Sequence, residues 1–272
     1  MYTLASKSVV ERSIVRVGSA TFGDGGFVMI AGPCAVEGRA QIASTAEFVE
    51  RCGAQMLRGG AYKPRTSPYA FQGLGDEGVG MIGRASAQSG LPAVVEALAE
   101  SQLSVLCEHV AMIQIGARNM QNFALLRAAA RTHKPILLKR SAAATLDELL
   151  YAAEYVLLEG NPNVVLCERG VRGFDPQTRN LFDLGGALRL KELTHLPVIA
   201  DPSHATGRRT LVEPLVLAAA AAGLDGAIVE VHPDPGAALS DAEQSLDFAG
   251  FERLMGRLDA MVRPQFSLAA CR

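Results

Sequence analysis

The chain has 272 residues, of which 49% are hydrophobic and 20% charged, with a formal net charge of −2. This composition is typical of a globular protein with a large core, in one α/β domain or two smaller ones. It argues against a nucleic-acid binder, because no basic excess is available to cover a phosphate backbone. No signal sequence opens the chain and no apolar run reaches membrane-spanning length, so we expect a cytoplasmic protein without a membrane partner. Five cysteines, an odd number without a CxxC pair, also favour a reducing compartment.

Residues 1–26 are predicted to form an N-terminal extension. Within it, SIVRVGSATFGDGG reads as a small β-hairpin that could plug the N-terminal mouth of the domain that follows. From residue 27 onward, short apolar runs alternate with helical patterns. The runs cover residues 27–32, 54–59, 92–97, 111–116, 135–140, 163–169, 197–202 and 226–231.

The helical patterns between these runs have their own start and stop signals. In residues 145–160, Thr145 and Glu148 fit a capping box and Gly160 fits a C-terminal stop. Continuously apolar strands separated by helices indicate a buried parallel sheet, and eight of them predict a single (β/α)8 TIM barrel over 27–265, with a tail at 266–272. A doubly wound open sheet is the second interpretation, although GPCAVEG is not the glycine-rich fingerprint that it would normally carry.

Chemically versatile side chains stand at or just after nearly every predicted strand end. They are Cys34, Arg58, Glu96, Arg118, Lys139, Arg140, Glu168, Arg169, Asp201, His204, Glu230 and His232. The strand ends of a barrel converge on one face, where such folds place their active sites. The loop RGGAYKPRTSPYAFQGLG, residues 58–75, adds Lys63 and Arg65 to that face. Several cations in one place predict an anion site rather than a solvated basic loop.

A second set of residues has the chemistry of metal ligands. Cys34, His204, Glu230 and Asp241 would offer thiolate, imidazole and carboxylates, which suit Zn²⁺, Fe²⁺, Mn²⁺ or Co²⁺. Taken singly, Cys34 could equally be a packing residue and Asp241 a helix cap. The three histidines His109, His133 and His195 are expected at the surface.

Several motifs together carry a family resemblance. GPCAVE, RGGAYKPRTSPYAFQGLG, IQIGARNMQN, LLKR, CERG with TRN, DPSHATGRR and VEVHPDP with ALSDAEQSL occur in that order. They resemble the 3-deoxy-D-arabino-heptulosonate 7-phosphate synthases of the short, barrel-only type over residues 28–248. The resemblance implies a (β/α)8 fold, a divalent metal and a homotetramer or homodimer. It also implies condensation of phosphoenolpyruvate with erythrose 4-phosphate at the entry to the shikimate pathway.

The resemblance also implies a role for each residue of the two sets. The metal ligands would be Cys34, His204, Glu230 and Asp241, and His204 is counted among the catalytic residues as well. The phosphoenolpyruvate contacts would be Arg58, Lys63, Arg118, Lys139 and Arg169. The aldose phosphate would lie on Arg65, Thr66 and Ser67. Lys63 is placed to protonate the new alkoxide, and Glu96 or a metal-bound water is the expected base for the water that adds.

Three departures from the family pattern leave alternatives open. Ser141 stands where the family usually has glycine, ALAESQ follows Glu96 where Asp-Pro is common, and Ala111 replaces a frequent acidic residue. These leave room for a related synthase with a different aldose, either of the octulosonate type or a secondary-metabolism paralogue. KPRTS argues against the octulosonate type, which typically has an Asn-Arg-Ser version of this loop. A non-catalytic metabolite-binding barrel is the third hypothesis.

Overall fold

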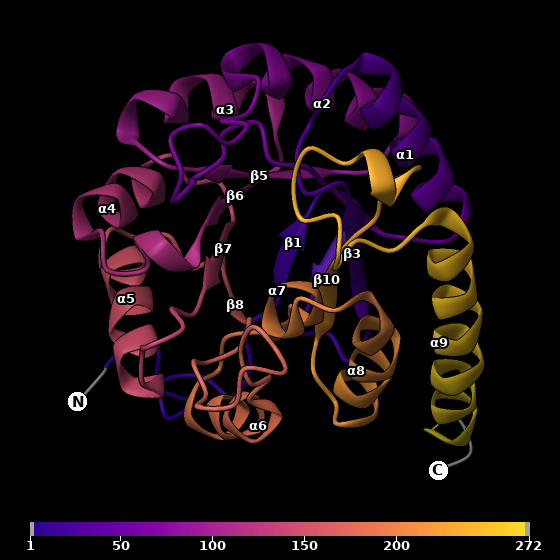
Figure 1. The fold of residues 1–272 in the computed structure, drawn as a ribbon. Coiled ribbons are helices and arrows are strands. Elements are labelled where there is room, and N and C mark those ends of the chain that lie inside the picture. Colours follow the sequence, from indigo (N-terminus) through magenta and orange to yellow (C-terminus); the bar gives the residue numbers. More distant parts are fainter. Residues whose placement is uncertain (1–2, 270–272) are drawn as a thin grey trace.

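The computed structural model describes residues 3–269, with side chains as far as Val262, and shows a closed barrel of eight parallel strands (Figure 1). The strands are β3 (Val28–Gly32), β4 (Met56–Arg58), β5 (Ala93–Ala97), β6 (Met112–Ile115), β7 (Ile136–Lys139), β8 (Val164–Glu168), β9 (Val198–Ala200) and β10 (Gly226–Glu230). Each strand lies within one of the eight predicted runs. Pairing of β10 with β3 closes the sheet, so the predicted barrel is confirmed and the open-sheet alternative is excluded.

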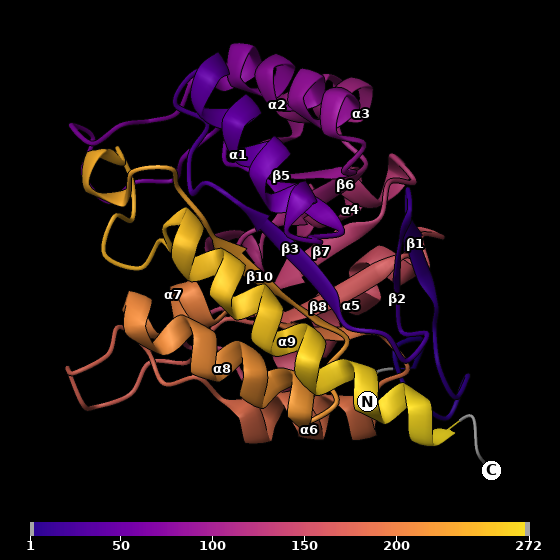
Figure 2. The ribbon, with the colours of Figure 1, turned by 90° about the vertical axis from the view of Figure 1, so that its right-hand side faces the viewer.

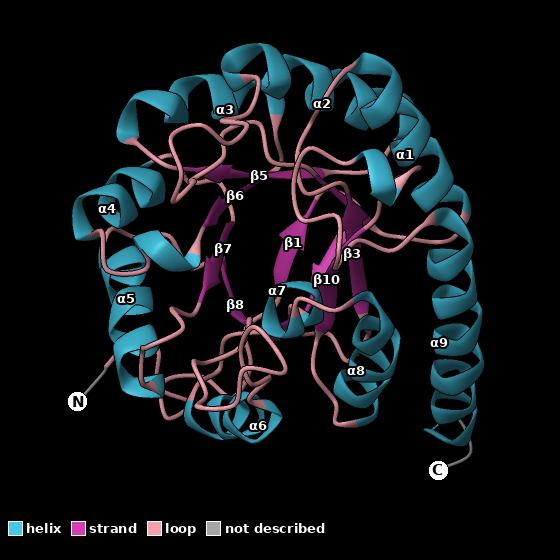
Figure 3. Cartoon of the chain, in the orientation of Figure 1, coloured by secondary structure: helices cyan, strands magenta, loops and turns pink. Residues whose placement is uncertain are grey.

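Helices surround the strands as an outer ring, and the short helix α7 (Pro202–Thr206) lies inside this ring (Figure 3). The ring consists of α1 (Arg39–Arg51), α2 (Gly75–Ser89), α3 (Leu103–His109), α4 (Phe123–Arg131), α5 (Leu146–Leu158), α6 (Leu184–Leu193), α8 (Arg209–Ala221) and α9 (Phe248–Ala269). The predicted capping box opens α5, where Thr145 accepts from the Glu148 N–H and Glu148 accepts from the Thr145 N–H. Gly160 follows this helix with a left-handed φ of 84°.

Helix α9 passes the predicted boundary at residue 265 and continues to Ala269. Residues 270–272 of the predicted tail lie outside the described residues. Within residues 3–269, no helix is both long and apolar enough to cross a membrane.

The predicted hairpin consists of β1 (Val15–Val17) and β2 (Ala20–Phe22) and lies beside the barrel in Figure 2. Its side chains Val15, Val17 and Phe22 are buried and belong to the same apolar cluster as the residues inside the barrel. Those interior residues are Val28, Ile30, Met56, Val94, Met112, Leu137, Val165, Cys167, Ile199 and Ile228. The hairpin therefore closes the N-terminal end of the barrel with its own hydrophobic side chains.

The segment before the hairpin is held by His195, which was predicted at the surface and is in fact buried with 8% exposure. Its Nε2 lies 2.7 Å from the Leu4 carbonyl oxygen, and its Nδ1 lies 2.7 Å from Ser13 Oγ. Since a carbonyl can only accept, Nε2 carries the proton and Nδ1 accepts from Ser13. The prediction was wrong because the partners of His195 lie some 190 residues away along the chain.

Candidate active site

Polar side chains form a layer at the carboxyl end of the barrel. They follow the interior apolar residues by two positions, as Arg58 follows Met56 and Lys139 follows Leu137. Because alternate side chains of a strand face the same side, these polar residues continue the inward-facing column. The layer consists of Arg58, Glu96, Gln114, Lys139, Arg169, Asp201 and Glu230.

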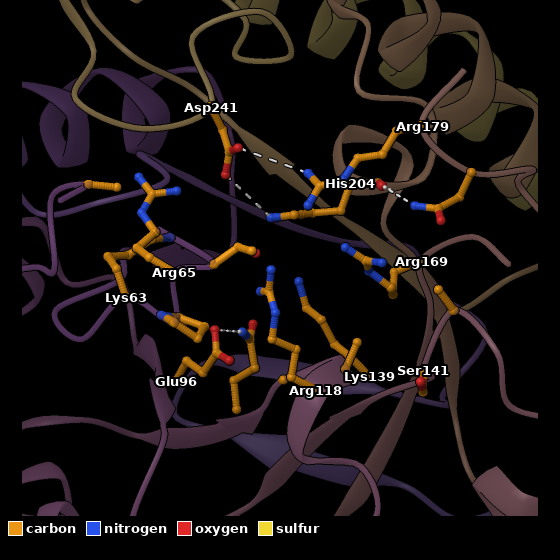
Figure 4. Close-up of a pocket in the computed structure, with 18 of the residues that line it drawn as sticks. Lys63, Arg65, Glu96, Arg118, Lys139, Ser141, Arg169, Arg179, His204 and Asp241 are labelled. Carbon is orange, nitrogen blue, oxygen red and sulfur yellow. Dashed lines mark hydrogen bonds and ion pairs between the residues drawn. The ribbon is translucent and has the colours of Figure 1, made fainter. Parts of the chain in front are cut away.

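Above this layer is a cavity of about 570 Å³ whose charged lining residues are mainly cations (Figure 4). The cations are Arg58, Lys63, Arg65, Arg118, Lys139, Arg169, Arg172 and Arg179. Thr66, Ser67, Glu96, His204 and Asp241 also line it. The structure thus brings every side chain expected to contact substrate into one cavity.

The deepest cations are paired with buried carboxylates. Arg58 Nη1 lies 2.6 Å from Glu230 Oε1, and Lys139 Nζ lies 2.6 Å from Asp201 Oδ2. Burial alone would raise the pKa of Asp201, but the adjacent His204 and Lys139 hold that pKa well below its usual range. These ion pairs satisfy the buried charges and fix two cations at the floor of the cavity.

Higher in the cavity the positive charge is not balanced. Within residues 3–262, neither Arg118 nor Arg169 makes a side-chain hydrogen bond or ion pair. Burial lowers the pKa of Arg169, and the neighbouring Arg179 and Arg118 lower it further against the opposing effect of Asp201. A pocket with this surplus of positive charge is suited to polyanionic ligands.

The loop of residues 58–75 owes its shape to close backbone approaches. A Cβ on Gly60 would lie 2.7 Å from the Cys34 carbonyl oxygen, and Gly73 has a left-handed φ of 90°. The Lys63 N–H donates to the Gln72 carbonyl at 3.0 Å, which closes the loop on itself. Lys63 is consequently buried in the cavity wall, whereas Thr66 and Ser67 are exposed at the rim.

The four predicted metal ligands meet beside the cavity. The ligand atoms of Cys34, His204, Glu230 and Asp241 all lie within 4.8 Å of one another. Cys34 Sγ is 2.9 Å from Asp241 Oδ2, and His204 Nε2 is 3.3 Å from Glu230 Oε1. One sulfur, one nitrogen and two carboxylates form a donor set that fits a borderline divalent cation such as zinc, iron, manganese or cobalt.

Neighbouring groups orient these four side chains. His204 Nδ1 lies 2.8 Å from Asp201 Oδ2, which directs Nε2 toward the other ligands in the manner of a carboxylate–histidine pair. Lys63 Nζ donates to Cys34 Sγ and to the Cys34 carbonyl, both at 2.9 Å. Burial and the charge of Glu230 raise the pKa of the Cys34 thiol to about 12, although Lys63 opposes that shift.

Glu96 is seated against two residues of β6 and the turn that follows it. The Gln114 amide donates to Glu96 Oε2 at 3.1 Å. A Cβ on Gly116 would lie only 1.8 Å from Glu96 Oε1, so the carboxylate occupies space that any side chain at 116 would take. Glu96 therefore has a defined position in the cavity wall.

Arg140 and Glu168 are strand-end residues that do not line the cavity. Arg140 Nη1 lies 2.9 Å from both Glu168 Oε2 and Asp183 Oδ2, and it faces the helix layer rather than the interior. Arg140 follows Lys139 by one residue and Glu168 precedes Arg169 by one residue, so both side chains point away from the inward-facing column. Their ion pairs join the ends of β7 and β8 to the start of α6.

We expect Arg140→Leu to destabilise the protein by about 3 to 5 kcal/mol at neutral pH, because it leaves the fully buried Glu168 carboxylate without its cation. Burial already raises the pKa of Glu168, and Arg140 is the main group opposing that shift. The folded variant should bind more protons than its unfolded chain, so its stability falls as pH rises from the ordinary glutamate pKa of about 4.3. Urea unfolding at several pH values measures this.

The matched control is Arg189→Leu, which removes an exposed ion pair with Glu192. It should change stability by less than about 1 kcal/mol and show little dependence on pH. Equal losses in the two variants at neutral pH would contradict the prediction.

Some residues of the site were not predicted from the sequence. Gln114 is one, and the alternation of β6 could have identified it. Arg172 and Arg179 lie on the loop between β8 and α6, beyond any strand pattern. That loop is anchored by hydrogen bonds from the Arg172 N–H to Ala142 O at 2.7 Å and from Asn180 Nδ2 to His204 O at 3.2 Å.

Comparisons with known proteins agree on one family. Residues 10–263 match the model of the DAHP synthetase I family. A phospho-2-dehydro-3-deoxyheptonate aldolase of Thermotoga maritima is 49% identical over 255 residues, which cover 93% of this chain and 75% of that protein. A 2-dehydro-3-deoxyphosphooctonate aldolase of a Bradyrhizobium species is 32% identical over 267 residues, covering 91% and 93% of the two chains.

Two solved structures from Thermotoga maritima are similar throughout the barrel. The crystal structure of its DAHP synthase has a TM-score of 0.94 at 46% identity, covering 97% of this chain and 78% of the other. A truncated form of the 3-deoxy-D-arabino-heptulosonate 7-phosphate synthase has a TM-score of 0.91 at 43% identity, covering 97% of both chains.

Proposed function

Because the chain belongs to the DAHP synthetase I family, we propose that it condenses phosphoenolpyruvate with erythrose 4-phosphate to give 3-deoxy-D-arabino-heptulosonate 7-phosphate and phosphate, the first step of the shikimate pathway. One observation carries this proposal. The Cys34, His204, Glu230 and Asp241 cluster adjoins a deep cavity with more cations than carboxylates. Two phosphorylated substrates and a metal are what such a site can hold.

Phosphoenolpyruvate is assigned to five of the cations. Its carboxylate and phosphate would take the charges of Arg58, Lys63, Arg118, Lys139 and Arg169, of which Arg118 and Arg169 make no side-chain hydrogen bond or ion pair within residues 3–262. The phosphate of the aldose would lie at the rim on Arg65, Thr66 and Ser67. Arg58 and Lys139 are paired with buried carboxylates, which fix the positions of these two side chains before substrate binds. Fewer side chains then become ordered on binding, so its entropic cost is lower.

The reaction needs one proton delivered and one removed. The third carbon of phosphoenolpyruvate attacks the aldehyde carbon, and Lys63 Nζ donates a proton to the alkoxide that forms. Water adds to the second carbon, and Glu96 is placed to take its proton. The C–O bond to phosphate in the resulting hemiketal then breaks, its hydroxyl becomes the ketone carbonyl, and the hydroxyl proton leaves with the phosphate, whose remaining charge Arg118 and Arg169 stabilise. A divalent cation on Cys34, His204, Glu230 and Asp241 would supply Lewis-acid polarisation of the aldehyde oxygen.

Assembly and location belong to the same proposal. We propose a homotetramer or homodimer, as the family resemblance implies. We also propose that the protein works in the cytoplasm, since the four described cysteines Cys34, Cys52, Cys107 and Cys167 are all free thiols.

Phosphate release from phosphoenolpyruvate tests the proposal, with erythrose 4-phosphate or arabinose 5-phosphate as the second substrate and with Mn²⁺ under reducing conditions. We expect rapid turnover with the four-carbon sugar alone. Turnover with arabinose 5-phosphate would favour the function named for the phosphooctonate aldolases, which are 27 to 32% identical to this chain. No turnover with either sugar in fully metallated protein would contradict both.

A further inference from the structure

Glu37 belongs to the GPCAVE segment, yet it takes part in no step proposed above. Its side chain is 12% exposed and accepts two hydrogen bonds from the loop that follows β10. Oε2 lies 3.2 Å from His232 Nε2, and Oε1 accepts from the Leu239 N–H at 2.9 Å. His232 Nδ1 accepts from the Asp234 N–H at 3.1 Å, so its proton is on Nε2 and points at Glu37.

These bonds connect the two loops that carry Cys34 and Asp241. Glu37 stands three residues after Cys34, and Leu239 stands two residues before Asp241. Asp241 has a left-handed φ of 53°, which a non-glycine residue keeps only when its surroundings hold it there. Glu37 restrains this conformation, because it fixes the backbone of the loop directly before Asp241.

The same loop reaches the rim of the cavity. The Leu239 carbonyl accepts from Arg65 Nη2 at 3.4 Å, and Arg65 lies on the same side of the cavity as Asp241 in Figure 4. One carboxylate therefore holds a backbone segment that borders both the predicted metal ligands and the predicted aldose-phosphate site.

We propose that Glu37 is a positioning residue, which acts through Leu239 and His232 to hold Asp241 within reach of the metal and Arg65 within reach of the aldose phosphate. The metal and the aldose phosphate are those of the proposed function, on which this inference rests. Glu37 itself touches neither.

The test compares Glu37→Ala and Glu37→Gln with the unchanged protein by titrating Mn²⁺ into metal-stripped samples, without substrates. We expect Glu37→Ala to weaken Mn²⁺ binding by about 10- to 100-fold, the usual cost of losing a group that orients a metal ligand. Glu37→Gln should lose less, because its amide oxygen can still accept from Leu239 while its NH₂ group opposes the His232 Nε2 proton. It also provides a nearly isosteric variant if the alanine protein does not fold.

Kinetics at saturating Mn²⁺ separate positioning from a general structural role. The KM for erythrose 4-phosphate should rise in both variants, whereas the KM for phosphoenolpyruvate and kcat should stay within about twofold of the unchanged protein. Glu77→Ala, on an exposed turn of α2, is the matched control and should change none of these values.

Two results would overturn the inference. One is Mn²⁺ affinity within twofold of the unchanged protein in folded Glu37→Gln and Glu37→Ala. The other is an equal rise in both KM values together with a lowered Tm, which is the pattern of nonspecific loosening. Failure of the proposed function would look different, since unchanged protein would then bind Mn²⁺ and still form no product.

Discussion

Replacing Lys63 by methionine is expected to lower kcat by about 10³-fold, with a smaller effect on the KM for phosphoenolpyruvate. Methionine is close in length to lysine and can fill the same buried position, but it has no proton to give to the alkoxide. The Lys63 ammonium also donates to Cys34 Sγ and to the Cys34 carbonyl, so its loss removes one hydrogen bond from each, although Ser240 Oγ and the Gly60 N–H remain as partners. Steady-state measurement of phosphate release, with Mn²⁺ binding measured in parallel, distinguishes lost proton donation from a damaged metal site.

Two further variants calibrate this result. Lys63→Arg keeps the charge but its guanidinium gives up a proton poorly, so it should bind phosphoenolpyruvate and still turn over slowly. Lys7→Met removes an exposed lysine bonded to the Lys191 carbonyl and should be fully active. A Lys63→Met protein within tenfold of normal kcat would show that another group delivers the proton.

Removal of the metal is the second change with a large expected effect. A strong chelator should lower activity by at least about 10³-fold, and added Mn²⁺ should restore it, because the ligand atoms of Cys34, His204, Glu230 and Asp241 converge on one point that a divalent cation can occupy. Stripped protein should remain folded. Arg58, Lys63 and Asp201 already provide hydrogen-bond partners for Glu230, Cys34 and His204.

His204→Ala provides the control for this experiment. It removes a ligand while leaving the barrel intact, so it should bind Mn²⁺ weakly and stay inactive after metal is added. Chelator-treated protein that keeps full activity after its metal content has been shown to be negligible would rule out a metal-dependent reaction.

The fold could be predicted from the sequence because its strands are continuously apolar until their carboxyl ends. All four residues of β7 are buried. Such parallel strands give short continuous runs in the sequence rather than the repeat of an amphipathic helix, and each begins and ends near a turn signal. Strand ends were less certain. Lys139 and Arg140 both looked like cavity residues, but alternation sends only the first one inward and pairs the second with Glu168.

The site was predictable where a residue stands at a strand end or in a motif. The predicted metal ligands Cys34, His204, Glu230 and Asp241 come from motifs of the sequence, and the structure brings them within reach of one another. Contacts between distant loops were not predictable. Arg179 approaches Asp241 at 3.9 Å across 62 positions, and no local pattern encodes that separation.

The hairpin closes the N-terminal end of the barrel, and the cavity lies at the carboxyl end. Val15, Val17 and Phe22 pack with the apolar side chains that fill the barrel interior, so the cavity at the carboxyl end has a closed base. Arg58 and Lys139 lie near its floor with about 5% exposure, while Thr66 and Ser67 stand at its lip. If the proposed substrate sites are correct, we expect the ligand of the floor to bind before the ligand of the lip, because the second would cover the first.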